Sequence, residues 1–159
     1  MSIEWSKSLA TGLEWQDTQH KELFKRISAL IDAMNVGLGR DEVGRIFKFL
    51  DEYFVIHFSA EDEAMKKYNF PGGAFHMAEH RRFQQDVEQI RDECRGNNIT
   101  TSTVIKVQRL VVDWLINHIG GIDKVLGEYI LRIEKKGVTE PARPEDLAQV
   151  RTDSTKTLS

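Results

Sequence analysis

The placement of proline is the sequence feature that most constrains the fold. The three prolines are Pro71, Pro141 and Pro144, so residues 1–70 and 72–140 are free of the strongest helix breaker. In these two stretches apolar and aromatic residues recur at spacings of three and four, which is the period of an amphipathic helix. No stretch alternates with a period of two over the length of a strand. The sequence therefore predicts long helices and essentially no sheet.

Four helices are expected because four stretches carry such an apolar stripe and are bounded by residues that start or stop helices. Their expected ranges are 17–36, 41–68, 74–95 and 103–136. Asp41 is expected to cap the second helix, and the cluster Thr100–Ser102 to cap the fourth. A helix of roughly 20 residues is about 30 Å long, and short connections favour antiparallel neighbours. The predicted fold class is therefore all-α, an up-down-up-down antiparallel four-helix bundle.

The two ends of the chain differ from the predicted bundle. We expect the first dozen residues to form a non-helical N-terminal arm whose Ile3, Trp5 and Leu9 pack on the helices. From Gly137 the sequence turns polar and gathers two of its three prolines, as in a loosely ordered tail. A chain of 159 residues is about the size of one domain. We therefore expect one domain over residues 1–136 and a flexible polar tail over residues 137–159.

Charge and composition exclude several classes of partner. Lys and Arg number 22 and Asp and Glu 25, for a net charge of −3, and no basic stripe of the kind that binds nucleic acid or a membrane surface is present. No apolar run approaches the roughly 20 residues that cross a bilayer. The single cysteine, Cys94, cannot form an intramolecular disulfide, and the N-terminus does not resemble a signal peptide. We therefore expect a cytoplasmic protein.

The histidines carry the strongest functional signal. The chain has five, and each lies on the apolar stripe of its predicted helix: His20, His57, His76, His80 and His118. Glu61 lies four residues after His57, on the same face. One such histidine is more often a hydrogen-bonded core residue, but five imidazoles and a carboxylate without partners would severely destabilise a bundle core. Imidazole and carboxylate are ordinary transition-metal ligands, so the pattern predicts a metal centre.

Asp123 is a further candidate ligand. It lies five residues after His118, which on an ideal α-helix places it about 140° away. Gly120 and Gly121 lie between the two and could permit a wide turn or π-bulge, which would bring Asp123 toward the histidine face. The alternative is an exposed acid at a glycine break.

Together these residues resemble the hemerythrin family, and in particular its single-domain bacteriohemerythrins. The similar set is His20, His57-x-x-x-Glu61, His76-x-x-x-His80 and His118-x-x-x-x-Asp123. Three flanking segments are similar to family signatures as well: 17–21, 57–65 and 114–119. The resemblance covers about residues 3–135, and it departs at Asp62, where relatives often carry Glu.

The resemblance implies a cofactor of two non-haem iron ions with a bridging oxo or hydroxo group. His76, His80 and His118 would hold one iron, and His20 and His57 the other. Glu61 and Asp123 would bridge both. The first iron then has six ligands and the second five, which leaves an open position for a small neutral ligand. The ligand of the family is dioxygen.

A dry apolar lining would protect bound dioxygen from water. Six residues match pocket positions of the family or lie beside a ligand: Leu23, Phe58, Phe83, Trp114, Leu115 and Ile119. The alternative for all six is ordinary core packing.

The resemblance leaves several functions open. The first is reversible dioxygen binding for storage, carriage or buffering, by a protein that is not an enzyme. The ligand set is rich in nitrogen, unlike ferritin-like sites built on Glu-x-x-His, and fewer anionic oxygens favour reversible binding over oxygen activation. The alternatives are an oxygen or redox sensor, a di-iron peroxidase or nitric-oxide-handling enzyme, and a site for zinc or another divalent metal.

Overall fold

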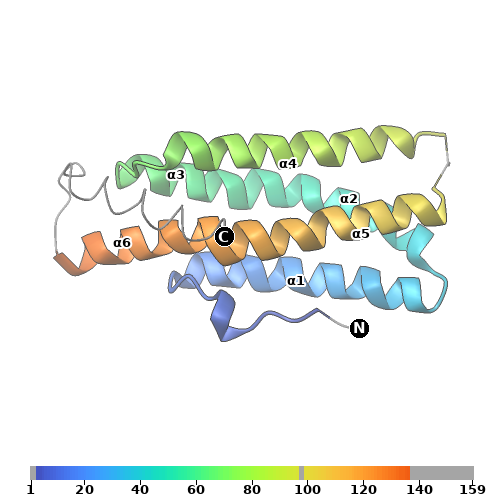
Figure 1. Cartoon of the computed structure of the whole chain (residues 1–159), viewed down its shortest axis with the longest axis horizontal. Helices are drawn as coiled ribbons and strands as arrows, with labels where there is room; N and C mark the ends of the chain where they lie inside the picture. Colours follow the sequence, from blue (N-terminus) through green and yellow to red (C-terminus); the bar gives the residue numbers. More distant parts are fainter. Residues whose placement is uncertain (1–2, 97–98, 137–159) are drawn as a thin grey trace.

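Four helical rods lie side by side in the computed structural model, which describes residues 3–96 and 99–136 (Figure 1). The first rod is α1 (Glu14–Asn35) and the third is α4 (Gly73–Glu93). The second rod joins α2 (Gly39–Tyr53), the π-helix η2 (Phe54–Phe58) and α3 (Ser59–Lys67). The fourth rod joins α5 (Thr101–Trp114), the π-helix η3 (Leu115–Asp123) and α6 (Lys124–Lys136). The described residues include no strand. The predicted all-α four-helix bundle is confirmed.

The start of the second rod differs from the prediction. Asp41 does not cap it: the helix begins at Gly39, with Leu38 at the N-cap. The reason lies in the preceding turn, where Leu38 N–H donates to Ala33 O and Gly37 N–H to Met34 O, the pattern of a Schellman motif. Gly37 supplies the positive φ of 79° that this motif requires. The turn is therefore complete two residues before Asp41, which lies in the first helical turn instead.

The fourth rod begins within the predicted capping cluster, at Thr101, two residues earlier than expected. Thr100 is the N-cap, and its side chain accepts a hydrogen bond from Thr103 N–H while the Thr103 side chain reaches back to the Thr100 N–H. This reciprocal pair satisfies two backbone donors that a helix end otherwise leaves free. The helix then runs through Gly120 and Gly121 to Lys136, as expected.

The N-terminal arm packs on the bundle as expected but is not wholly non-helical, because Lys7–Leu9 form a 3₁₀ turn, η1. Ile3, Trp5 and Leu9 are partly buried against the main core. Asp17 holds the end of the arm by accepting hydrogen bonds from the backbone N–H groups of Thr11 and Gly12. The predicted tail, residues 137–159, lies outside the described residues.

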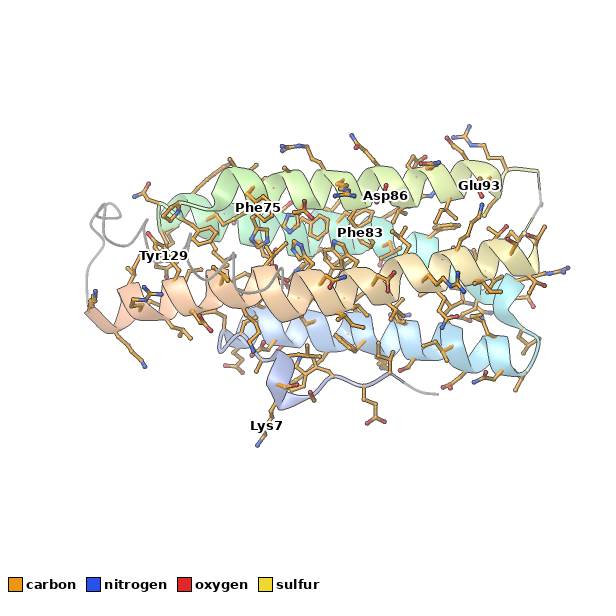
Figure 2. The ribbon with its side chains drawn as sticks, in the orientation of Figure 1. Lys7, Phe75, Phe83, Asp86, Glu93 and Tyr129 are labelled. Atoms are coloured by element: carbon orange, nitrogen blue, oxygen red, sulfur yellow. The ribbon has the colours of Figure 1, made fainter. Side chains whose placement is uncertain are left out.

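The two π-helices lie in the middle of their rods, where the apolar cores of the bundle meet. One large core cluster, which includes Ile27, Leu50 and Val111, fills the end of the bundle near the α1–α2 turn, and a smaller one around Tyr129 lies toward the end of α6. Side chains fill the space between the rods along their length (Figure 2). None of the described helices is both long and apolar enough to cross a membrane.

Candidate metal centre

The seven candidate ligands converge between the two core clusters. All seven residues are buried, none more than 3% exposed. Every rod contributes: α1 carries His20, the second rod His57 and Glu61, α4 His76 and His80, and η3 His118 and Asp123. The structure thus brings together all the residues that the sequence singled out as metal ligands.

The π-helix η3 explains how Asp123 reaches this cluster. A π-helix bonds each N–H to the carbonyl five residues earlier, so five residues complete roughly one turn. Asp123 therefore lies on the same face as His118, and their Oδ1 and Nε2 atoms are 2.9 Å apart. Asp123 is fully buried, so the alternative of an exposed acid at a glycine break is wrong.

The ligand atoms form two groups, and both groups contain Glu61 and Asp123. One adds the nitrogens of His76, His80 and His118, and the other adds those of His20 and His57; within each group the atoms lie within 4.8 Å of one another. The two histidine sets have no member in common. This division matches the two sets of ligands implied by the family resemblance.

The two oxygens of Glu61 face different groups. Oε1 lies 2.9 Å from His57 Nε2. Oε2 lies 3.0 Å from His76 Nε2 and 2.9 Å from His80 Nε2. One carboxylate therefore offers an oxygen to each half of the centre.

Asp123 is divided in the same way. Its Oδ2 lies 2.9 Å from His20 Nε2, whereas Oδ1 lies 3.1 Å from His76 Nε2 and 2.9 Å from His118 Nε2. Both acids thus stand between the two histidine sets with one oxygen toward each. This is the arrangement that two cations bridged by two carboxylates require.

The contacts between these atoms fit coordination better than hydrogen bonding. His20 Nε2, His57 Nε2 and both oxygens of Asp123 are buried without a hydrogen-bond partner among the described residues, although ligand atoms lie 2.9 Å from each. Two donor atoms at right angles on a metal about 2.1 Å away lie about 3.0 Å apart. The donor set of imidazole and carboxylate suits a transition metal. The residues therefore fit metal ions.

Electrostatics also favour cations at this place. Burial alone would raise the pKa of Glu61, but the charge of His57 and close contacts with His57, His76 and His80 hold it well below its ordinary value. Burial and the charge of Glu61 would raise the pKa of Asp123, yet His118 and His20 hold that pKa well below its ordinary value too. Two carboxylates that remain ionised in a dry core need compensating positive charge.

His76 is one source of that positive charge. Burial would lower its pKa, but contacts with Asp123 and Glu61 raise it to about 10. Burial lowers the pKa of His80, and the charges of His76 and His118 lower it further against the influence of Glu61. A cation that binds must therefore displace the proton of His76, because only a neutral imidazole coordinates a metal.

Three polar residues beside the centre were not predicted from the sequence. Gln16 donates from Nε2 to Glu61 Oε1 at 2.6 Å, and Gln19 Oε1 lies 2.5 Å from His57 Nδ1. Tyr53 stacks on the His57 ring, with centroids 4.6 Å apart. Gln16 and Tyr53 each lie four residues before a candidate ligand, so helical spacing could have identified them. The Gln19 contact fixes the His57 tautomer that leaves Nε2 free.

The six predicted pocket residues are all buried in the main core cluster. Phe58 stacks on His80 with ring centroids 3.8 Å apart, and Trp114 stacks on His118 at 4.4 Å. Phe83 extends from α4 toward the fourth rod and stacks on Trp114 (Figure 2). Leu23, Leu115 and Ile119 are completely buried. The structure thus surrounds the candidate ligands with apolar side chains.

Comparison with known proteins gives matches over most of the chain. Residues 11–130 match the family described as the hemerythrin HHE cation binding domain. The chain is 31% identical over 126 residues to a bacteriohemerythrin of Methylococcus capsulatus, an alignment that covers 79% of the chain and 94% of that relative. It is 31% identical over 121 residues to a hemerythrin-like protein of Naegleria gruberi, covering 76% and 87% of the two chains. A bacteriohemerythrin of Aquifex aeolicus is 24% identical over 133 residues, covering 82% and 98%.

Proposed function

The chain belongs to the hemerythrin family, and we propose that it binds dioxygen reversibly at a centre of two non-haem iron ions with a bridging oxo or hydroxo group. In this proposal it stores, carries or buffers dioxygen in the cytoplasm and is not an enzyme. The observation that carries the proposal is the division of the Glu61 and Asp123 oxygens between two sets of histidines.

Each ligand has a role that follows from this division. His76, His80 and His118 would hold one iron, His20 and His57 would hold the other, and the two carboxylates would bridge both. The set with two histidines offers one nitrogen fewer, so the open position for dioxygen belongs to that half. When bound, the two ferrous ions supply the electrons that dioxygen binding requires.

The surrounding side chains keep water from this half of the centre. Tyr53 covers one face of His57, and Leu23 follows His20 by nearly one helical turn on α1. Both are buried, and so are Leu115 and Ile119 on the fourth rod. An apolar lining slows hydration of a bound ligand and loss of charged products. The same residues therefore serve as core packing and as the dioxygen pocket.

The functional domain is proposed to extend over residues 1–136, with residues 137–159 as a separate tail. The family match within residues 11–130 and the packing of Ile3, Trp5 and Leu9 on the core support the N-terminal part of this boundary. Helix α6 (Lys124–Lys136) accounts for the chain up to the proposed C-terminal boundary.

The proposal predicts a colour change that follows the supply of dioxygen. Protein reduced with dithionite under argon is expected to bind two irons per chain, to develop a visible absorption band on exposure to dioxygen, and to lose it when argon returns. The measurement is an absorption spectrum at each step together with metal analysis. Irreversible oxidation on first exposure would favour a redox sensor or an enzyme. Zinc in place of iron, in protein produced with ample iron, would contradict the proposal.

A further inference from the structure

Gln16 is a buried polar residue that touches the centre and has no role in the proposed function. It lies in the first turn of α1, one helical turn before His20, and its side chain is completely buried. Its amide nitrogen Nε2 donates a hydrogen bond of 2.6 Å to Glu61 Oε1. An ionised carboxylate only accepts hydrogen bonds, so the nitrogen and not the oxygen of the amide must face Glu61. The contact is therefore a charge-assisted hydrogen bond in a dry environment.

This hydrogen bond acts on one half of the centre. The oxygen that accepts it, Oε1, is the one 2.9 Å from His57 Nε2 and 3.9 Å from His20 Nε2. Oε2, which faces His76 and His80, has no amide partner, and within residues 3–96 and 99–136 neither oxygen of Asp123 accepts a hydrogen bond. Of the four carboxylate oxygens, Oε1 of Glu61 alone shares its charge with an amide of the described chain. The bridge is consequently asymmetric.

An asymmetric bridge donates unequal electron density to the two metal positions, so their reduction potentials differ. A carboxylate oxygen that shares charge with an N–H group is a weaker donor to a metal. Donation from anionic oxygen stabilises a ferric ion more than a ferrous ion, so a weaker donor favours the reduced state. Hydrogen bonds to ligand atoms are a general means by which proteins set redox potentials.

We propose that Gln16 is a positioning residue that holds Glu61 Oε1 and raises the reduction potential of the iron between His20 and His57. The inference rests on the proposed function, because it concerns the iron that would bind dioxygen. The step affected is the loss of one electron from a ferrous ion, which becomes ferric, to a one-electron oxidant such as ferricyanide, which becomes ferrocyanide. No bond in the protein forms or breaks. Gln16 thereby keeps the centre in the reduced state that binds dioxygen.

The test replaces the amide with an apolar group of similar length. In Gln16→Met the hydrogen bond is lost while the buried volume is nearly kept, so two irons per chain should remain. The oxidation equilibrium is expected to shift about tenfold toward the ferric state, which corresponds to about 59 mV for a one-electron couple. The measurement is a redox titration of the holoprotein followed by its visible spectrum, with iron analysis of the same sample. Gln85→Met, at an exposed glutamine of α4, is the control and should leave the potential unchanged.

A second variant makes the test independent of how well methionine packs. Gln16→Asn retains an amide but is one methylene shorter, so it cannot maintain the 2.6 Å contact, and its potential should shift in the same direction. Unchanged potentials in both variants with two irons bound would overturn the inference. Loss of iron from both would also overturn it, because Gln16 would then serve assembly of the centre and not its potential. Absence of two irons from the unaltered protein would instead contradict the proposed function.

Discussion

Replacement of Glu61 by alanine is expected to lower the iron content from two per chain to less than one. Glu61 offers one oxygen to His57 and the other to His76 and His80, so its removal takes an anionic ligand from both halves at once. Two metal ions close together also need the negative charge of the bridge to offset their repulsion. The measurement is metal analysis of protein produced with ample iron, with the absorption spectrum of the same sample.

The effect should be specific to the buried carboxylates. Glu63→Ala removes an exposed acid from the same helix, α3, and should leave two irons in place. Asp123→Ala should lower the iron content as Glu61→Ala does, because the Asp123 oxygens are divided between the same two sets of histidines. Two irons and an unaltered spectrum in both alanine variants would contradict the bridging roles.

Removal of the metal is expected to lower the thermal midpoint of the protein by about 10 °C. A ligand that binds only the folded state stabilises it by about 4 kcal/mol when present at a thousand times its dissociation constant. For a domain of this size, 1 kcal/mol shifts the midpoint by about 2–4 °C. Calorimetry of the iron-loaded and chelator-treated proteins gives the difference, and Glu61→Ala should show no comparable gain when iron is added. Equal midpoints for the loaded and metal-free native protein would contradict the account.

The pH dependence of this difference follows from His76. Its pKa in the metal-free fold is raised from 6.5 to about 10, so its contribution to metal-free stability is fully present below pH 6.5 and is lost as the pH rises through 10. Metal binding needs neutral His76 and therefore strengthens over the same interval. The gap between loaded and metal-free midpoints should widen as the pH is raised above 6.5. The pKa values of Glu61 and Asp123 are lowered, so their stabilising effect is present above about pH 4 and is lost in acid.

Much of the fold can be predicted from the sequence because proline spacing and apolar periodicity are local signals that repeat along the whole length of each helix. The capping cluster at Thr100–Ser102 was predicted correctly because Thr100 caps the helix through its own side chain. The cap at Asp41 was wrong because the Schellman turn at Gly37 involves backbone groups on both sides and competes with a side-chain cap. A sequence pattern shows which residues could cap a helix. Whether a side-chain cap or a backbone turn forms depends on the geometry of the whole turn.

The metal centre also has parts that the sequence could predict and parts that it could not. The histidines and Glu61 stand out in the sequence because ionisable groups on an apolar stripe need partners, and the glycine pair signals the wide turn that brings Asp123 to them. The π-helix Phe54–Phe58 carries no such signal, since the segment has neither glycine nor proline. Gln16 lies one helical turn before His20, and this spacing places it near the centre but does not identify the atom to which it donates. That partner, Glu61, is 45 residues away and reaches it only through packing of the first two rods.

The most direct test of the two-iron centre is anomalous diffraction at the iron absorption edge from crystals of the iron-loaded protein. The account predicts two iron peaks per chain. One lies among His76, His80 and His118, the other beside His20 and His57, and an oxygen of Glu61 and of Asp123 contacts each. A single peak, or two peaks without a carboxylate between them, would contradict the central claim.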